Sequence, residues 1–145
     1  MTTRDEISQM RRNYGDAGLE ISDLNPNPTV QLLKWLGEAA NNQFIVEANA
    51  MVLSTFAQGK LTSRSVLLKD VTDAGLSFFT NYNSRKAKSM AENSQVALLF
   101  PWYAMERQVS LSGSISKLSE SESDAYFATR PRGSQIGAWA SAQSE

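Results

Sequence analysis

Three groups of basic residues are the features of this sequence best suited to chemistry. Arg64 and Lys69 flank residues 65–68, Ser84-Arg85-Lys86 opens an expected helix, and Arg130-Pro131-Arg132-Gly133-Ser134 follows another. An arginine can hold a phosphate through two parallel hydrogen bonds, and a lysine adds a compact charge. The free N–H groups at a helix start also favour an anion. Together the three groups could hold two separate phosphates.

Each basic group also has an ordinary structural explanation. Cations at strand ends are usually solvated, and those after residue 129 can simply end a helix, where positive charge is favourable. Lys88 lies four residues before Glu92, so the helix between them can carry a solvated charged face. Arg64 and Lys69 are five positions apart and would face opposite sides of a regular strand. A ligand shared by both requires backbone contacts, a β-bulge, or a ligand wrapped around the strand edge.

The residue types that are missing exclude several kinds of catalysis. The chain has no cysteine and no histidine. It therefore has no thiolate nucleophile, no imidazole base and no zinc site built from these ligands, and we expect no metal. An enzyme of this composition would leave the difficult chemistry to a cofactor, while the protein binds and orients the reactants.

Composition and charge predict one globular domain spanning residues 1–145. The chain is 41% hydrophobic and 20% charged, and its 145 residues suit a single core. Fourteen basic against fifteen acidic residues leave a net charge of −1, which argues against a nucleic-acid partner. The start lacks the apolar core of a signal peptide, and no run is long enough to span a membrane. We therefore expect a cytoplasmic protein without a membrane contact.

The helices expected from the sequence lie around a central β-region. Residues 1–27 form a flexible N-terminal segment, with a short polar helix over 4–14. A second helix begins at Pro28, and its inward stripe, widened by Leu32 and Trp35, consists of Val30, Leu33, Leu36 and Ala40. A helix over 84–92 turns Ala87, Met90 and Ala91 inward. Capping-box spacing from Ser119 to Glu122 predicts a last helix over 120–130.

The central region reads as closely spaced strands. Alternating or continuous apolar residues predict strands at 50–56, 61–69, 76–80, 95–102 and 109–116, with a possible bulge at Gly113. Short turns between most of them favour an antiparallel meander that closes into a small barrel. The fold class expected is therefore mainly β with peripheral helices.

Four motifs resemble one known family. They are Arg64-Ser-Val-Leu-Leu-Lys69, Phe78-Phe-Thr-Asn81 with Ser84-Arg-Lys-Ala87, Leu99-Phe-Pro-Trp102 with Glu106-Arg-Gln-Val109, and Tyr126-Phe-Ala-Thr-Arg-Pro-Arg-Gly-Ser-Gln-Ile-Gly-Ala-Trp139. In this order the motifs resemble the pyridoxine (pyridoxamine) 5′-phosphate oxidases, over about residues 11–144. The resemblance implies an antiparallel FMN-binding split β-barrel that forms a homodimer, with FMN at the subunit interface.

The resemblance also implies which residues bind the cofactor. These are Arg64, Ser65, Val66, Leu67, Leu68, Lys69, Phe79, Thr80, Arg85, Lys86, Gln108, Gln143 and Ser144. Arg85 and Lys86 would bind the phosphate end of FMN, Gln108 would bond to its ring system, and the last two residues would reach the flavin of the neighbouring subunit. Phe79 stands where a tyrosine is common in the family, so the flat apolar contact is kept and a hydroxyl is lost.

A second set of residues matches the family's substrate contacts. Lys69, Tyr126, Arg130 and Ser134 would hold the substrate phosphate, and Arg11, Arg12, Asn13 and Tyr14 match a segment that covers the substrate or a secondary product site. The implied reaction oxidises pyridoxine 5′-phosphate and pyridoxamine 5′-phosphate to pyridoxal 5′-phosphate, with oxygen consumed and hydrogen peroxide formed. No residue of this chain is assigned a catalytic role.

The family has a C-terminal stretch that this sequence lacks. In the family that stretch contacts the flavin and covers the substrate ring, so we expect the 145-residue chain to bind its ligands but turn over poorly. Two alternatives stay open at this stage. One is a split-barrel flavin reductase with a substrate that carries no phosphate, and the other is a flavoprotein that only binds FMN or a vitamin B6 phosphate.

Overall fold

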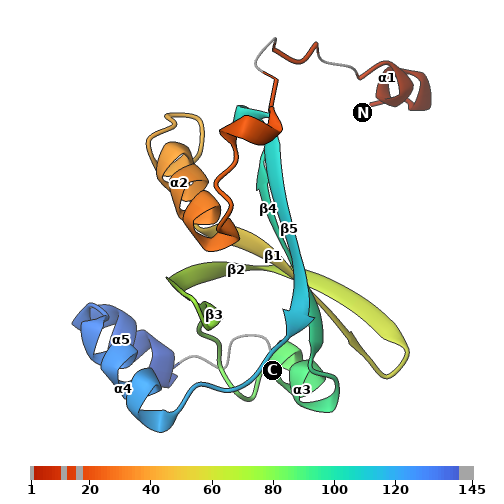
Figure 1. Cartoon of the computed structure of the whole chain (residues 1–145). Coiled ribbons are helices and arrows are strands. Elements are labelled where there is room, and N and C mark those ends of the chain that lie inside the picture. The colour runs from red at the N-terminus through yellow and green to blue at the C-terminus, as the bar shows by residue number, and fades with distance from the viewer. Residues whose placement is uncertain (1, 11–12, 16–17, 141–145) are drawn as a thin grey trace.

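Five strands form one curled antiparallel sheet in the computed structural model of this chain (Figure 1), which describes residues 2–10, 13–15 and 18–140. The sheet order is β3-β2-β1-β4-β5. The strands are β1 (Ala50–Ala57), β2 (Lys60–Thr72), β3 (Gly75–Phe78), β4 (Gln95–Trp102) and β5 (Arg107–Ser114). The antiparallel, mainly β fold class is thereby confirmed.

The strand order departs from the simple meander that the sequence predicts. Strands β1, β2 and β3 are joined by tight turns, of which the first places Gln58 and Gly59 at positive φ angles of 50° and 71°. The chain then returns through helix α3 (Arg85–Glu92), which packs on β1, and β4 pairs with the free side of β1. Because α3 carries the chain back across two strands, β1 lies at the centre of the sheet.

The core lies between the inner face of the sheet and helix α2 (Pro28–Ala40). Leu53 and Phe100 are completely buried, and the indole N–H of Trp102 donates to the Ala48 carbonyl at 2.9 Å. The inward stripe expected for α2 is wrong by part of a turn, because Val30, Leu33 and Ala40 are exposed. The face in the core is instead Leu32, Trp35, Leu36 and Ala39, which has the i, i+3, i+4, i+7 spacing of a helical stripe.

The remaining helices correct the sequence prediction at three points. Helix α1 (Arg4–Gln9) ends five residues earlier than expected, and α4 (Glu120–Thr129) is followed by a helix that was not expected, α5 (Arg132–Ala140). Ala91 of α3 is exposed, whereas Ala87 and Met90 are half-buried as expected. Two short 3-10 helices complete the chain, η1 (Ile21–Asp23) and η2 (Tyr103–Met105).

The predicted bulge is also in another place. Gly113 pairs with Val96 in regular register, so β5 has no bulge there. The register instead shifts in β2, where Leu68 pairs with Phe78 and Asp70 pairs with Ser77. Lys69 is the extra residue. In the described ranges, no helix is long and apolar enough to cross a membrane.

Candidate functional site

Arg64 lies on the inner face of β2 and is held there by three hydrogen bonds. Its guanidinium donates to the Leu53 carbonyl at 3.1 Å, to Thr55 Oγ1 at 2.9 Å and to Thr62 Oγ1. Thr55 is buried, so one end of the guanidinium is fixed against the β1–β2 ladder. This anchoring gives the positive charge of Arg64 a defined place on the sheet.

The start of α3 brings two more cations to the same place. Ser84 is the N-cap residue and is completely buried, and its hydroxyl accepts a hydrogen bond from the Ala87 N–H at 3.4 Å. The hydroxyls of Thr80 and Ser84 lie 3.4 Å apart. Arg85 and Lys86 follow in the first turn, where free backbone N–H groups add partial positive charge. The cation cluster consists of Arg64, Arg85 and Lys86.

The three cations repel one another. Burial lowers the pKa of Arg64, and the nearby charge of Arg85 lowers it further. Burial and the charge of Arg64 likewise lower the pKa of Lys86. Over residues 2–10, 13–15 and 18–140, no acidic side chain forms an ion pair with any of these three cations. Positive charge collected without a compensating carboxylate is the arrangement that an anionic ligand stabilises.

We expect this repulsion to make the ligand-free chain more stable at alkaline pH. A lysine whose pKa is lower in the folded state binds fewer protons there than in the unfolded state, so unfolding free energy rises with pH between the two pKa values. Removing the charge by Lys86→Gln should therefore stabilise the chain near neutral pH, with the advantage shrinking by about pH 10. Urea denaturation of both proteins at the two pH values measures this. An advantage that grows with pH would contradict the repulsion.

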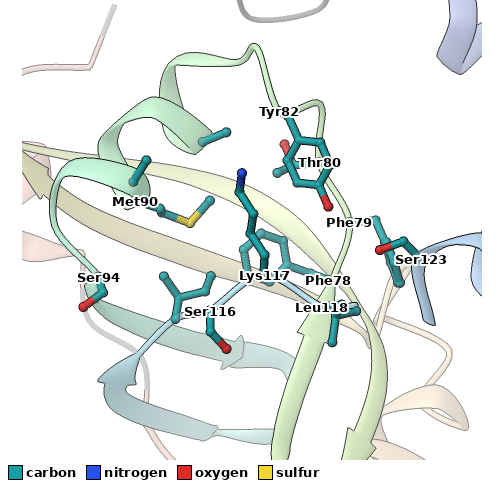
Figure 2. Close-up of a pocket in the computed structure, with 13 residues that line it drawn as sticks. Phe78, Phe79, Thr80, Tyr82, Met90, Ser94, Ser116, Lys117, Leu118 and Ser123 are labelled. Carbon is teal, nitrogen blue, oxygen red and sulfur yellow. The ribbon is translucent and has the colours of Figure 1, made fainter. Parts of the chain in front are cut away.

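A pocket of about 350 Å³ (Figure 2) is lined in part by Thr80, whose hydroxyl lies 3.4 Å from that of Ser84, and by Ala87, the residue after Lys86. It lies between the end of β3, helix α3 and the segment after β5. Its lining residues are Phe78, Phe79, Thr80, Tyr82, Ala87, Met90, Ala91, Ser94, Ile115, Ser116, Lys117, Leu118 and Ser123. Lys117 extends into the pocket, with its ammonium 5.0 Å from the centre of the Tyr82 ring. Apolar walls with one cation suit a flat aromatic molecule that carries negative charge.

Sequence reasoning missed most of this pocket. Tyr82, Met90, Lys117 and Leu118 come from three segments that only the fold brings together. Lys117 follows a strand in a serine-rich stretch and carries no local motif. The predicted residues Phe79 and Thr80 do line the pocket, although they follow β3 instead of belonging to it.

Two predicted ligand contacts touch each other directly. The rings of Phe79 and Tyr126 are stacked, with their centroids 3.6 Å apart and their planes 5° from parallel. Phe79 was predicted at the cofactor and Tyr126 at the substrate phosphate. The stack therefore places helix α4 against the end of β3, and near that edge α4 and α5 lie together in Figure 1.

The side chains of the predicted 64–69 segment alternate between the two faces of the sheet up to the bulge at Lys69. Arg64 and Val66 pair with the buried residues Leu53 and Met51 of β1, and Leu68 is itself buried, so all three face the inner side of the sheet. Ser65 and Leu67 face the outer side. Lys69, the extra residue of the bulge, is exposed. A ligand shared by Arg64 and Lys69 would require backbone contacts, a β-bulge or a ligand wrapped around the strand edge. Of these three, the β-bulge is present in β2.

Gln108 lies on the outer face of the sheet, away from the cation cluster. It pairs with Pro101 in β4 and is exposed. Register across β4 and β1 places it on the same face as Ser65 and Leu67, but β5 is the opposite edge strand from β3. One subunit therefore does not gather Gln108 and Arg64 around a common point.

The predicted substrate residues are brought together only in part. Arg130 caps α4 with its guanidinium carbon 5.9 Å from the Phe127 ring, and Ser134 is exposed on α5. Gln135, which the sequence reasoning missed, fixes this corner by donating to the Phe127 and Arg130 carbonyls at 3.0 Å each. No hydrogen bond within the described ranges joins Lys69 to this α4–α5 corner.

The predicted ligand contacts nearest the two ends of the chain are only partly within the described residues. Arg11, Arg12, Gln143 and Ser144 lie outside the described residues. Asn13 and Tyr14 are described and exposed.

Comparison with known families identifies the family to which this chain belongs. Residues 38–145 match the family model described as "Pyridoxamine 5′-phosphate oxidase". The chain belongs to the pyridoxamine 5′-phosphate oxidase family. This agrees with the resemblance drawn from the four motifs, and the match covers all of the cation cluster and the pocket.

Relatives in the family are longer than this chain. A pyridoxine/pyridoxamine 5′-phosphate oxidase from Burkholderia thailandensis is 50% identical over 145 residues, which cover 99% of this chain and 66% of the relative. One from Cupriavidus taiwanensis is 49% identical over 140 residues, covering 96% of this chain and 66% of the relative. The chain thus spans slightly less than two thirds of their length.

Solved structures show the same architecture. PhzG from Burkholderia lata, in complex with tetrahydrophenazine-1-carboxylic acid, aligns with a TM-score of 0.81 and 29% identity over 90% of this chain and 65% of that one. An FMN-binding, pyridoxamine 5′-phosphate oxidase-related protein from Nostoc punctiforme aligns with a TM-score of 0.60 and 16% identity, over 79% of this chain and 64% of that one. The latter likeness supports the split-barrel fold and nothing finer.

Proposed function

We propose that this chain binds FMN and oxidises pyridoxine 5′-phosphate and pyridoxamine 5′-phosphate to pyridoxal 5′-phosphate, with oxygen as the final acceptor. The observation that carries the proposal is the cation cluster of Arg64, Arg85 and Lys86 at the start of α3. It offers a phosphate three positive charges, free backbone N–H groups and the neighbouring hydroxyls of Thr80 and Ser84. The names of the relatives supply the substrate class.

The residues of the cluster fit the phosphate end of FMN. No carboxylate in the described ranges is paired with them, so a bound phosphate would replace repulsion with attraction. One face of the Phe79 ring is covered by Tyr126. Its other face is the flat apolar contact proposed for the flavin ring. Bound FMN supplies the two-electron acceptor that a chain without cysteine or histidine lacks.

A homodimer is part of the proposal, because Gln108 and the cluster lie on different faces of one sheet. A flavin touching both kinds of residue needs a second subunit on the outer face. That face carries exposed apolar side chains, with Phe56 44% exposed and its strand partner Leu61 79% exposed. Covering them with a second copy would bury apolar area that is otherwise in water.

The substrate's place follows from its phosphate. The proposed contacts are Arg130 and Ser134 at the α4–α5 corner, Tyr126 beside Phe79, and Lys69 at the bulge in β2. Holding the phosphate would fix the position of the substrate carbon to be oxidised relative to the flavin. The protein would raise the reaction rate mainly through this fixed orientation. PhzG carries a carboxylic acid ligand instead, so a phosphate requirement separates this proposal from a PhzG-like reaction.

The purified chain, reconstituted with FMN, should be yellow and bind one FMN per subunit as a dimer. Chromatography of the chromophore released on denaturation identifies the flavin, and sedimentation gives the assembly. Peroxide formation is then compared for pyridoxine 5′-phosphate and for pyridoxine without phosphate. Failure to bind added FMN would overturn the cofactor assignment. Equal rates with the unphosphorylated alcohol would overturn the substrate assignment, and flavin binding without any peroxide would favour a flavoprotein that only binds its ligands.

A further inference from the structure

The guanidinium of Arg64 is held by three neutral oxygen atoms. They belong to the Leu53 carbonyl and to the hydroxyls of Thr55 and Thr62. Neutral acceptors fix the direction of an arginine and leave its charge in place, whereas a carboxylate would neutralise that charge. In the part of the chain that the structure describes, no carboxylate pairs with Arg64. Its positive charge therefore stays available beside the other two members of the cation cluster.

Thr55 places a buried hydroxyl on an otherwise apolar face of β1. Met51, Leu53 and Thr55 are the buried positions that alternate along this strand, and Thr55 is only 1% exposed. A buried hydroxyl costs free energy unless it is hydrogen-bonded. Thr55 Oγ1 accepts from Arg64 Nη1 at 2.9 Å and lies 3.1 Å from Thr62 Oγ1. Valine has nearly the same shape without this cost, so the hydroxyl indicates a role in binding Arg64.

The three hydrogen bonds leave one edge of the Arg64 guanidinium open. They occupy three of the five N–H donors that a guanidinium has. Because the Thr55 and Thr62 hydroxyls lie 3.1 Å apart, they occupy the edge that Nη1 and Nη2 share. The other edge, formed by the Nε–H and the second Nη2–H, has no hydrogen-bond partner among the described residues. Two parallel N–H groups of this kind fit two oxygens of one phosphate.

We infer that Thr55 and Thr62 are positioning residues, which orient Arg64 so that its Nε edge meets the phosphate of the ligand. The inference rests on the proposed function for the identity of that phosphate as part of FMN. Neither threonine is assigned a contact with the ligand, and both act through Arg64. Holding this side chain in advance reduces the cost of ordering it when the phosphate binds.

FMN titration of two Thr55 variants separates the hydroxyl from the shape of the side chain. Thr55→Val removes only the hydroxyl and should weaken FMN by about three- to tenfold, the cost of ordering one long side chain on binding. Thr55→Ser keeps the hydroxyl and should keep the FMN affinity, although the lost methyl group lowers the unfolding free energy. Thr62→Val should weaken FMN less than Thr55→Val, because Thr62 is exposed and water can replace its hydroxyl. If Thr55→Ser weakens FMN as much as Thr55→Val, the role is merely structural and the inference is overturned.

A second pair of hydroxyls on the same two strands supplies a matched control. Ser54 Oγ and Ser63 Oγ lie 2.7 Å apart on the opposite face of the sheet, with no hydrogen bond to Arg64. Ser54→Ala removes this pair and should leave the FMN affinity unchanged. An equal loss in Ser54→Ala and Thr55→Val would mean that the effect does not pass through Arg64, which contradicts the inference.

A double variant tests whether Thr55 acts through Arg64. Arg64→Ala alone should weaken FMN, and adding Thr55→Val to it should cause no further loss, because the threonine then has no guanidinium to hold. Additive losses would show that the two residues act separately, and the inference would fail.

Nitrogen-15 NMR of the arginine side chains follows the orientation of Arg64 without FMN. The Arg64 signals are assigned by their loss in Arg64→Ala. Thr55→Val should broaden or merge the two Nη signals, because the guanidinium then rotates more freely. Inorganic phosphate should shift the Arg64 Nε–H signal of the unsubstituted chain, and shift it less at the same concentration in Thr55→Val.

These measurements keep the inference separate from the proposed function. If the unsubstituted chain binds no FMN, the proposed cofactor assignment fails, while the NMR experiment with inorganic phosphate still decides the orientation of Arg64. Nη signals that do not change in Thr55→Val would overturn the inference. An Arg64 Nε–H signal that phosphate leaves unshifted in the unsubstituted chain, or shifts equally in both proteins, would also overturn it.

Discussion

Lys86→Gln should weaken FMN binding by about ten- to a hundredfold, the usual worth of a charge-assisted hydrogen bond to phosphate. The same substitution should leave the ligand-free protein at least as stable as before. Lys86 and Arg64 repel each other in the empty site, because the charge of Arg64 lowers the pKa of Lys86. A side chain that destabilises the ligand-free protein but strengthens binding of the ligand is typical of a binding site.

Fluorescence titration with FMN gives the affinity, and urea denaturation without FMN gives the stability. Lys88→Gln is the matched control, because Lys88 is exposed on the same helix and is absent from the cluster. A loss of stability in Lys86→Gln equal to the loss of binding would mean that the lysine supports the fold. An equal loss of FMN affinity in Lys88→Gln would mean that only the overall charge of α3 matters.

Arg130→Ala should weaken pyridoxal 5′-phosphate by about ten- to a hundredfold and leave FMN affinity nearly unchanged. Arg130 sits at the corner between α4 and α5, whereas the proposed FMN phosphate site is at the start of α3. Because the proposal gives the two phosphates separate cations, each substitution should affect chiefly one ligand. Separate titrations of the Arg130 and Lys86 variants with both ligands measure this.

Two variants control for effects on the helical corner. Arg132→Ala removes a cation two residues away and should change neither affinity by more than about twofold, as expected of a solvated side chain. Arg130→Lys keeps the charge but loses the two-pronged geometry, so it should lie between the wild type and Arg130→Ala. Equal weakening of both ligands by Arg130→Ala would contradict the assignment of two separate phosphate sites.

Elements with strong local signals were predicted well from the sequence. Pro28 follows an asparagine that caps α2, with the Asn27 side chain accepting from the Thr29 and Val30 N–H groups. The Ser119–Glu122 capping box at α4 is present with both of its reciprocal hydrogen bonds. Strand β4 has the bounds that its apolar run predicted. These features depend on neighbours within a few residues, so the local sequence contains the information that determines them.

Helix α5 shows where a local signal was read incompletely. Pro131 ends α4 at Arg130, as expected, but the Pro131 carbonyl also accepts hydrogen bonds from the Ser134 and Gln135 N–H groups. A proline can begin a helix as well as end one, and α5 forms here although it contains Gly133 and Gly137. The four proposed substrate-phosphate residues were named from resemblance. The corner between α4 and α5, which holds Arg130 and Ser134, was not foreseen, and Lys69 lies apart from it on β2.

The sequence by itself determined which residues can offer positive charge to a phosphate and most of the local helices and strands. It also determined the lack of any histidine or cysteine chemistry. Only the tertiary structure decided the order of the strands, the face of α2 in the core, the bulge at Lys69 and the stack of Phe79 on Tyr126. The physical reason is that strand pairing and side-chain packing join residues far apart in the chain. Their energies depend on which faces α3 and α2 cover, and no short window of sequence contains that information.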